Sequence, residues 1–373
     1  MKRFFLPRTW ILLTLLLGIS NLSAQEPVHG RSDRTIQFPD IPGYRTLKCD
    51  LHMHTVLSDG SVWPNIRVEE ALRDGLDAIS ITDHIEYQPH LEDIPHPDRN
   101  RGYELARWAA KESDLLVING VEITRDMPPG HFNAIFIEDA NRLIQDDVMK
   151  VFREARKQDA FVFWNHPHWR AQIPSGVAAL QEIHHELISE GLINGIEIYN
   201  EYTYSDEALQ IGLDHNLTLL GTSDIHVLID WQFDVPGGGH RPVTLAFATE
   251  KSTAGIKEAL QNRRTAVWFD NTLVGNAEYL VPLIQQSLIV EREGDPRVHT
   301  LLIDNLSDAT YLLKNLSGYT FHDQASVFMV KAHEKTRIWV KTVESTDSFQ
   351  LRFAVLNAFT APGKHPEIEI VVE

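Results

Sequence analysis

The hydrophobic positions of this chain follow two patterns, one after the other. From residue 46 to about 270, short apolar runs alternate with longer amphipathic stretches. The runs are T-L-K-C-D-L-H, D-A-I-S-I-T-D-H, L-L-V-I-N-G-V-E-I-T, F-N-A-I-F-I-E, F-V-F-W-N-H-P, N-G-I-E-I-Y-N and L-T-L-L-G-T-S-D. Runs that are apolar almost throughout are typical of strands in a parallel sheet that is covered on both faces. Seven of them in a row favour a closed barrel over an open sheet.

The amphipathic stretches predict the helices that cover this barrel, at residues 64–74, 104–113, 141–158, 177–190 and 205–215. After Gly275, apolar and polar residues alternate between turn residues, which is the period of antiparallel strands with one buried face. The predicted fold is therefore α/β. We expect a distorted (β/α)7 TIM-like barrel over residues 46–275 and a small C-terminal β-sandwich-like domain over residues 276–373.

The start of the chain has the pattern of a secretory signal peptide. Lys2, Arg3 and Arg8 precede a short apolar run, and small residues stand before Gln25. This predicts cleavage after Ala24 and a secreted or periplasmic protein, with residues 25–45 as an N-terminal extension. An uncleaved membrane anchor is the alternative, but the run is short for a membrane span.

The composition of the chain limits the classes of substrate and partner that we expect. The chain has 34 basic and 52 acidic residues, a formal net charge of -18, and no basic stripe that could follow a nucleic-acid backbone. An anionic substrate would therefore have to be small. The single cysteine, Cys49, excludes an intramolecular disulfide, and we expect it to pack in the core.

Titratable residues stand at the ends of the predicted barrel strands. His52 and His54 end the first strand, and side chains two residues apart on a strand point to the same face. This pair with nearby Asp59 could bind a metal, but it could equally be two hydrogen-bonded polar residues. The later strands add His84, Glu122, His131, His166, Asp224 and His226.

Topology brings most of these residues together, because the C-terminal ends of parallel barrel strands meet at one mouth. His131 precedes its strand, so we expect the loop before it to carry its side chain to the mouth. Six histidines and three acids at strand ends are hard to place by chance. They indicate a metal centre.

The motifs D-L-H-M-H-T-V-L-S-D-G, G-L-D-A-I-S-I-T-D-H, G-V-E, N-H-P and S-D-I-H, in this order and spacing, resemble the PHP (polymerase and histidinol phosphatase) domain. This is a family of metal-dependent phosphoesterases with a distorted seven-stranded barrel. The export signal and the β-rich tail are similar in layout to secreted bacterial phosphodiesterases of the family.

The resemblance implies up to three metal ions. The first would be bound by His52, His54, Glu122 and Asp224, and the second by Asp59, His84 and His226. The third would share Glu122 and add His131 and His166. Family members often have histidine where this chain has Asp59, which favours a harder ion at the second position.

The expected cofactors are two or three divalent ions, zinc first because imidazoles suit it, with manganese or iron as alternatives. The resemblance implies hydrolysis of small phosphate esters, diesters preferred, by a hydroxide that bridges two ions. A phosphomonoesterase, an amidohydrolase-type metal hydrolase and a non-catalytic binding protein are the alternatives. No nucleic-acid partner is expected, nor a membrane partner after signal cleavage, and a homo-oligomer is left open.

Residues that contact the substrate are harder to assign. Arg125 follows a strand end, where it could clamp a phosphate or be a surface arginine. His168 could protonate a leaving group or lie at the rim, and Arg241 belongs to a glycine-rich loop that could cover the substrate. Asp50 and Asp83 could each accept an imidazole N–H and so orient a ligand.

Overall fold

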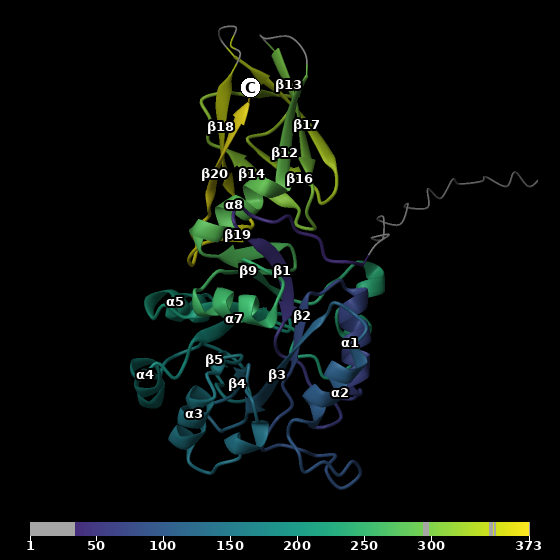
Figure 1. The fold of residues 1–373 in the computed structure, drawn as a ribbon. Coiled ribbons are helices and arrows are strands. Elements are labelled where there is room, and N and C mark those ends of the chain that lie inside the picture. The colour runs from purple at the N-terminus through teal and green to yellow at the C-terminus, as the bar shows by residue number, and fades with distance from the viewer. Residues whose placement is uncertain (1–33, 294–297, 343–345, 347, 373) are drawn as a thin grey trace, which may run out of the picture.

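A computed structural model of the chain describes residues 34–293, 298–342, 346 and 348–372. The predicted signal peptide lies outside the described residues. Figure 1 shows two parts, a body in which strands alternate with helices and an all-β part stacked on one end of it. Among the helices of the described ranges, none has the length and apolar character needed to cross a membrane.

The body is built on one curled sheet of 12 strands. The strands follow the order β19-β11-β10-β9-β1-β2-β3-β4-β5-β6-β7, and β8 also pairs with β6. The seven apolar runs form β1 (Arg45–Asp50), β2 (Ala78–Ile81), β3 (Leu116–Ile123), β4 (Phe132–Ile135), β5 (Phe161–Trp164), β6 (Gly195–Asn200) and β8 (Thr218–Thr222). The other strands are β7 (Thr203–Tyr204), β9 (Val243–Ala248), β10 (Thr265–Phe269), β11 (Thr272–Gly275) and β19 (Ala358–Phe359).

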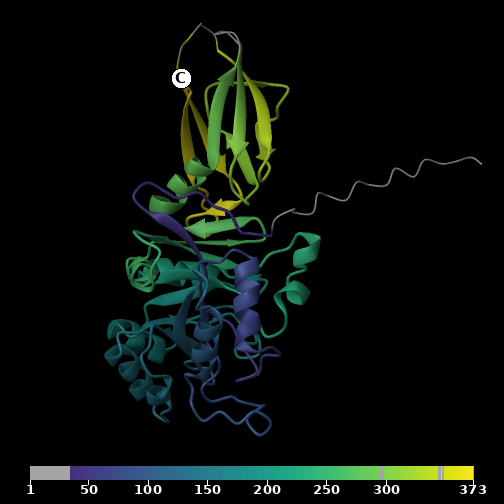
Figure 2. The same cartoon turned by 45° about the vertical axis from the view of Figure 1, so that its right-hand side comes forward.

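Helices cover the outside of this sheet, as Figures 1 and 2 show. They begin where the sequence offers caps: Pro64 occupies the first turn of α1, and the side chains of Asp147, Ser205 and Ser252 accept backbone N–H groups at the starts of α3, α5 and α7. The helices are α1 (Pro64–Arg73), α2 (Arg101–Ala109), α3 (Val148–Lys157), α4 (Glu182–Ser189), α5 (Asp206–Asp214), α6 (Ile229–Gln232) and α7 (Thr253–Gln261), with 3-10 turns η1 (Ala140–Leu143) and η2 (Val235–Gly237).

One strand runs against the expected direction. β4 pairs antiparallel with both β3 and β5, whereas β1–β2, β2–β3, β5–β6 and β6–β8 are parallel pairs. The start of β4 therefore lies at the same sheet edge as the C-terminal ends of its neighbours. The direction of β4 therefore brings His131 to that edge. The expectation that the loop before His131 carries its side chain there was wrong.

The curled sheet closes at this edge. Beyond β1 and β8, Met53 and Ile225 form a parallel bridge, and the N–H of His54 donates to the carbonyl of Ile225 at 3.0 Å. The N–H of Asp224 donates to the carbonyl of His52 at 2.9 Å. The predicted fold class, a distorted TIM-like barrel followed by a β-sandwich, is confirmed. The antiparallel strands β9, β10 and β11 were not predicted.

The C-terminal part consists of two four-stranded antiparallel sheets, with the orders β12-β13-β17-β15 and β16-β14-β18-β20. Alternating burial along β18 and β20 follows the alternating sequence, because one face of each sheet packs inward. The strands are β12 (Leu288–Glu293), β13 (Val298–Asn305), β14 (Tyr311–Asn315), β15 (Phe321–His322), β16 (Val327–Val330), β17 (Lys335–Lys341), β18 (Phe349–Val355) and β20 (Glu367–Val372).

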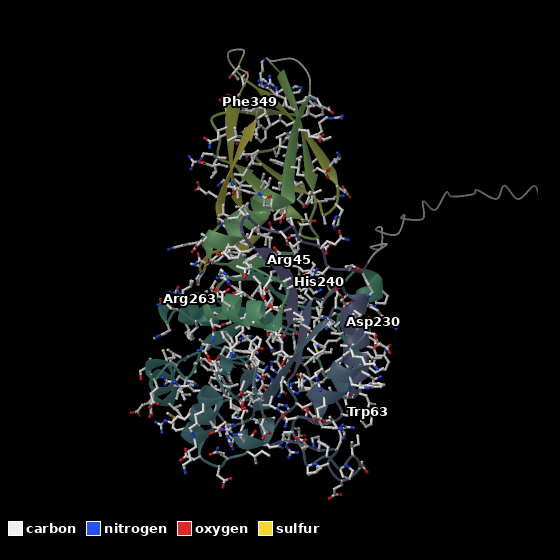
Figure 3. All side chains as sticks on the ribbon, viewed as in Figure 1. Arg45, Trp63, Asp230, His240, Arg263 and Phe349 are labelled. Carbon is white, nitrogen blue, oxygen red and sulfur yellow. The ribbon has the colours of Figure 1, made fainter. Side chains whose placement is uncertain are left out.

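The two parts share elements. Helix α8 (Ala277–Ser287) links them, and β19, which follows β18 in the sequence, pairs with β11 of the body. In Figure 3, Arg45 at the start of β1 lies near the junction and Phe349 lies in the outer half of the sandwich. β1 runs away from the sandwich in Figure 1, so its C-terminal end is the end of the strand further from the sandwich.

Candidate metal centre

The predicted strand-end residues converge around one buried carboxylate, that of Glu122 on β3. Three groups of histidine and acidic residues have ligand atoms within 4.8 Å of one another. Glu122 belongs to two of these groups and lies close to the members of the third. All nine residues predicted as metal ligands lie in this cluster or in direct contact with it.

The first group contains His52, His54 and Glu122, and Asp224 contacts both of its histidines. The Nε2 atoms of the two histidines lie 3.0 Å apart, and Asp224 Oδ1 lies 3.1 Å and 3.0 Å from them. The Glu122 oxygens lie 3.6 Å from His52 Nε2 and 3.4 Å from His54 Nε2. Ligand atoms about 2.0–2.1 Å from one zinc ion are separated by about 3.0–3.4 Å. His52, His54 and Asp224 therefore have the spacing of ligands of a single ion, and Glu122 lies beside them.

The second group surrounds Asp59. Its oxygens lie 3.3 Å from His226 Nε2 and 3.5 Å from His84 Nε2. His54 also belongs here, because its Nδ1 lies 3.7 Å from Asp59 Oδ1 and its ring stacks on those of His84 and His226. The three residues predicted for the second ion are thus together, and His54 stands between the first and second groups.

The third group differs in part from the prediction. His131 Nδ1 lies 3.1 Å from Glu122 Oε1, as expected for two residues that share an ion. His84 joins them, with its Nδ1 2.7 Å from Glu122 Oε2. His166 lies further out, with its Nε2 3.5 Å from Glu122 Oε1 and 3.9 Å from Asp224 Oδ2.

The donor set fits divalent cations. Imidazole nitrogens and carboxylate oxygens are the ligands that zinc, manganese and iron take in proteins. His166 Nδ1 is buried and has no hydrogen-bond partner among the described residues, and the buried oxygens Glu122 Oε2 and Asp224 Oδ1 face imidazole nitrogens of the cluster. Buried polar atoms of this kind are rare in proteins unless something else satisfies them. Here they point to bound cations.

The carboxylates of the cluster are held in their ionised form. Burial alone would raise the pKa of Glu122, but the imidazoles of His84, His52 and His131 lower it well below its usual range. The imidazoles around Asp224 and Asp59 likewise outweigh burial and lower the pKa of both groups. These acids are therefore ready to act as anionic ligands.

The imidazoles divide into two kinds. Burial, together with the positive charges of His226 and His84, lowers the pKa of His54 to about 3, so its ring is neutral and can coordinate directly. Burial also acts on His84, but Glu122 and Asp59 raise its pKa to about 10. Asp59 and Asp224 raise the pKa of His226 to about 9 against the effect of burial. The rings of His84 and His226 must each lose a proton before they coordinate.

Two of the candidate ligands have strained backbones. His166 has φ 28° and Asp224 has φ 47°, both in the left-handed region that residues other than glycine rarely adopt. Asp224 is held there by its N–H bond to His52, and the N–H of His166 donates to Glu197 Oε2 at 2.7 Å. Strain of this kind persists where the surroundings fix a functional geometry.

Glu197 on β6 was not predicted as a site residue. Its side chain is fully buried, and its Oε1 accepts from His52 Nδ1 at 2.7 Å and from Thr222 Oγ1 at 2.6 Å. The bond to Nδ1 fixes the ring of His52 so that Nε2 faces the cluster. An acidic residue inside an otherwise apolar buried strand was the signal that could have revealed this role.

Two other acids hold the site in ways that differ from the prediction. Asp83 accepts from Thr55 N at 2.7 Å and from Ser58 Oγ at 2.8 Å, and so fixes the loop after β1 instead of an imidazole. Asp50 accepts from Ser223 Oγ at 2.6 Å, next to Asp224. Both acids support ligand-bearing backbone.

The three residues predicted to contact the substrate are differently placed. Arg241 is fully buried, with Nη1 3.1 Å from Asp50 Oδ2 and Nη2 2.6 Å from Asp74 Oδ2, so it cannot cover a substrate. Arg125 is near the mouth, but its Nη2 lies 2.9 Å from Glu86 Oε1. His168 is buried with its Nε2 2.8 Å from Thr203 Oγ1, and this burial lowers its pKa.

Comparison with known proteins gives the family. The chain is 43% identical to a two-domain protein from Bacteroides vulgatus ATCC 8482 that contains a predicted PHP-like metal-dependent phosphoesterase. The match covers 92% of this chain and 99% of that chain, with a TM-score of 0.85. The chain therefore belongs to the family of PHP-like metal-dependent phosphoesterases.

Other comparisons add the C-terminal part. Residues 289–371 match a family of Ig-like domains. A putative metal-dependent phosphoesterase from Bifidobacterium adolescentis ATCC 15703 is 18% identical over 49% of this chain and 89% of its own, and its TM-score of 0.38 is too low to bear on this chain. No curated protein matches significantly.

Proposed function

We propose that this protein hydrolyses small phosphate esters at a centre of two or three divalent ions. The observation that carries the proposal is the convergence of three carboxylates and several imidazoles from separate strand ends on Glu122. His52, His54, Glu122 and Asp224 would hold one ion, and Asp59, His84 and His226 a second. His131 and His166, with Glu122, would hold the third.

Bound divalent ions supply a water-derived nucleophile at neutral pH and positive charge for the phosphoryl oxygens. The residues of the chain orient the ligand atoms toward these ions. Glu197 keeps a proton on Nδ1 of His52, and Ser58 Oγ, 3.3 Å from His54 Nδ1, does the same for that ring. Both Nε2 atoms therefore face the cluster as lone-pair donors. Zinc is the first candidate, with manganese or iron as alternatives.

Phosphodiesters are the preferred substrates in this proposal. A diester carries one negative charge at neutral pH and a monoester carries up to two. Both arginines that the sequence offered for phosphate binding are already paired with carboxylates, Arg125 with Glu86 and Arg241 with Asp50 and Asp74. A site whose nearby cations are engaged in this way suits the less charged ester. A monoesterase of the same family is the alternative.

The proposed location is outside the cytoplasm, on the strength of the N-terminal sequence pattern. Expression of the full chain in a host with a secretion system should give a protein that begins at Gln25. A mature protein that still carries residues 1–24 would contradict this part of the proposal.

A panel of phosphate mono- and diesters, tested with metal-loaded protein, tests the activity. We expect diester turnover that a chelator abolishes and that metal restores. Asp224→Asn should lower it more than about 100-fold, because it removes an anionic ligand. Asp214→Asn, at an exposed acid on α5, is the matched control. No turnover of any ester by protein that holds its ions would overturn the proposal.

A further inference from the structure

Two large aromatic side chains are half exposed beside the candidate ligands. Tyr87 is 53% exposed and Trp169 is 46% exposed. The ring of Tyr87 meets that of His84 edge to face, with centroids 5.9 Å apart. The ring of Trp169 lies 5.7 Å from that of His131 and 5.2 Å from that of His166.

These contacts form a continuous row of rings. His84 and His131, both close to Glu122, lie in the middle with their centroids 5.6 Å apart. Tyr87 extends the row at one end and Trp169 at the other. The two aromatic side chains therefore flank the His84–Glu122–His131 group from opposite ends of the row.

The backbone fixes both aromatic residues to strand ends. Tyr87 follows β2, where the N–H of Ile85 donates to the carbonyl of Glu122 at 2.9 Å. Trp169 follows β5, and its N–H donates to the carbonyl of His166 at 2.8 Å. Each aromatic residue is thus tied to a candidate ligand, which makes its position part of the site.

We propose that Tyr87 and Trp169 determine specificity by binding flat rings on the organic groups of the substrate, so that the preferred substrates are aryl or nucleoside phosphodiesters. This rests on the proposed function. A diester carries an organic group on each side of phosphorus. With the phosphoryl group at the middle of the row, each organic group lies against one aromatic side chain. Stacking of a base on an aromatic side chain strengthens binding about 5- to 100-fold.

Unreactive phosphinates test this directly, because their P–C bonds resist hydrolysis. Diphenylphosphinate carries a ring on each side of phosphorus, and dimethylphosphinate has the same charge without rings. Calorimetric titration of metal-loaded protein should show that diphenylphosphinate binds at least about 10-fold more tightly. Tyr87→Ala and Trp169→Ala should each lower this ratio, and the double variant should bring it close to one.

Controls separate stacking from damage to the site. Tyr87→Phe and Trp169→Phe keep a ring and should keep most of the ratio. Trp108→Ala removes a tryptophan of α2 that is 69% exposed and whose ring pairs with Lys111, and it should leave the ratio unchanged. Equal affinities for the two phosphinates, or a ratio that the alanine variants do not alter, would overturn the inference while the phosphoesterase site stands. If neither phosphinate nor inorganic phosphate binds, both proposals fail.

Discussion

Single residues divide into those that the sequence could reveal and those that it could not. His52, His54, Glu122 and Asp224 stand at strand ends, and one topological rule predicts that they meet. Glu197 contacts His52 across 145 residues of sequence. It lies inside β6, a strand for which no ligand was predicted. Such a contact depends on the register between strands, which local patterns do not specify.

The role of Glu197 leads to a prediction about metal affinity. Glu197→Gln keeps the shape but removes the charge that the protonated Nδ1 of His52 faces. The glutamine also offers only one acceptor oxygen to the hydrogen-bond donors that share the two carboxylate oxygens of Glu197. We expect the affinity for the ion of the first group to fall about 10- to 100-fold, as is usual when the partner of a ligand histidine is lost. A competition titration against a chromophoric chelator measures this.

Glu182→Gln, at an exposed position on α4, is the control and should leave the affinity unchanged. If Glu197→Gln binds its ions as tightly as the wild type, the contact with His52 does not tune the centre.

Arg241 leads to a prediction about stability. Its guanidinium pairs with Asp50 and Asp74 in the buried interior, so Arg241→Met leaves the buried Asp50 without its cation, whereas Asp74 keeps its ion pair with Arg34. Breaking one side of a buried ion pair costs about 3–5 kcal/mol, and the free energy of unfolding should fall by that order. Urea denaturation monitored by circular dichroism measures it.

Arg153→Met removes an exposed arginine that lies 2.9 Å from Glu190, and serves as the matched control. Exposed pairs contribute little, so this variant should unfold like the wild type. Equal stability of the two variants would show that the buried pairs are dispensable.

At the scale of elements, the existence of strands was easier to predict than their direction. All seven apolar runs are strands, but β4 runs antiparallel to its neighbours and so brings His131 to the mouth. A buried strand is apolar whichever way it runs, so the pattern could not distinguish the two directions. The hairpin of β10 and β11 was not predicted.

The loop after β1 gives an element-scale prediction. A Cβ on Gly60 would lie 2.7 Å from the backbone carbon of His54 and 2.7 Å from the nitrogen of Thr55. Gly60→Ala must therefore shift the loop that carries Asp59. We expect the second ion to bind about 10-fold more weakly or to be lost, with the first retained. Metal content after dialysis, measured by mass spectrometry, counts the ions.

Gly318→Ala is the control, because its added Cβ meets no atom within 4 Å. A full complement of ions in Gly60→Ala would mean that the loop tolerates the shift or that Asp59 is not a ligand.

In the whole molecule, the sandwich is stacked on one end of the body (Figure 1). The alternating sequence predicted six of its strands, but not the way it is joined to the body. Asn357 joins them: its Nδ2 donates to the carbonyls of Asn271 and Thr310, each at 2.7 Å, and its Oδ1 accepts from Leu312 N at 2.9 Å. The loop between β18 and β20 thus returns to the edge of the barrel sheet, a long-range pairing with no local signature.

This arrangement predicts that stability and metal binding respond separately to a change at the junction. Asn357→Ala removes three side-chain hydrogen bonds, of which the one to Asn271 joins the two parts, and should lower the free energy of unfolding by about 1–3 kcal/mol. The metal content should not change, because none of these bonds involves a candidate ligand. Asn262→Ala, whose side-chain bonds go to Glu258 of its own helix, should have a smaller effect on stability. Thermal unfolding and metal analysis on the same samples measure the stability and the metal content of each variant. Loss of ions from Asn357→Ala at a temperature where it remains folded would show that the junction acts on the metal centre.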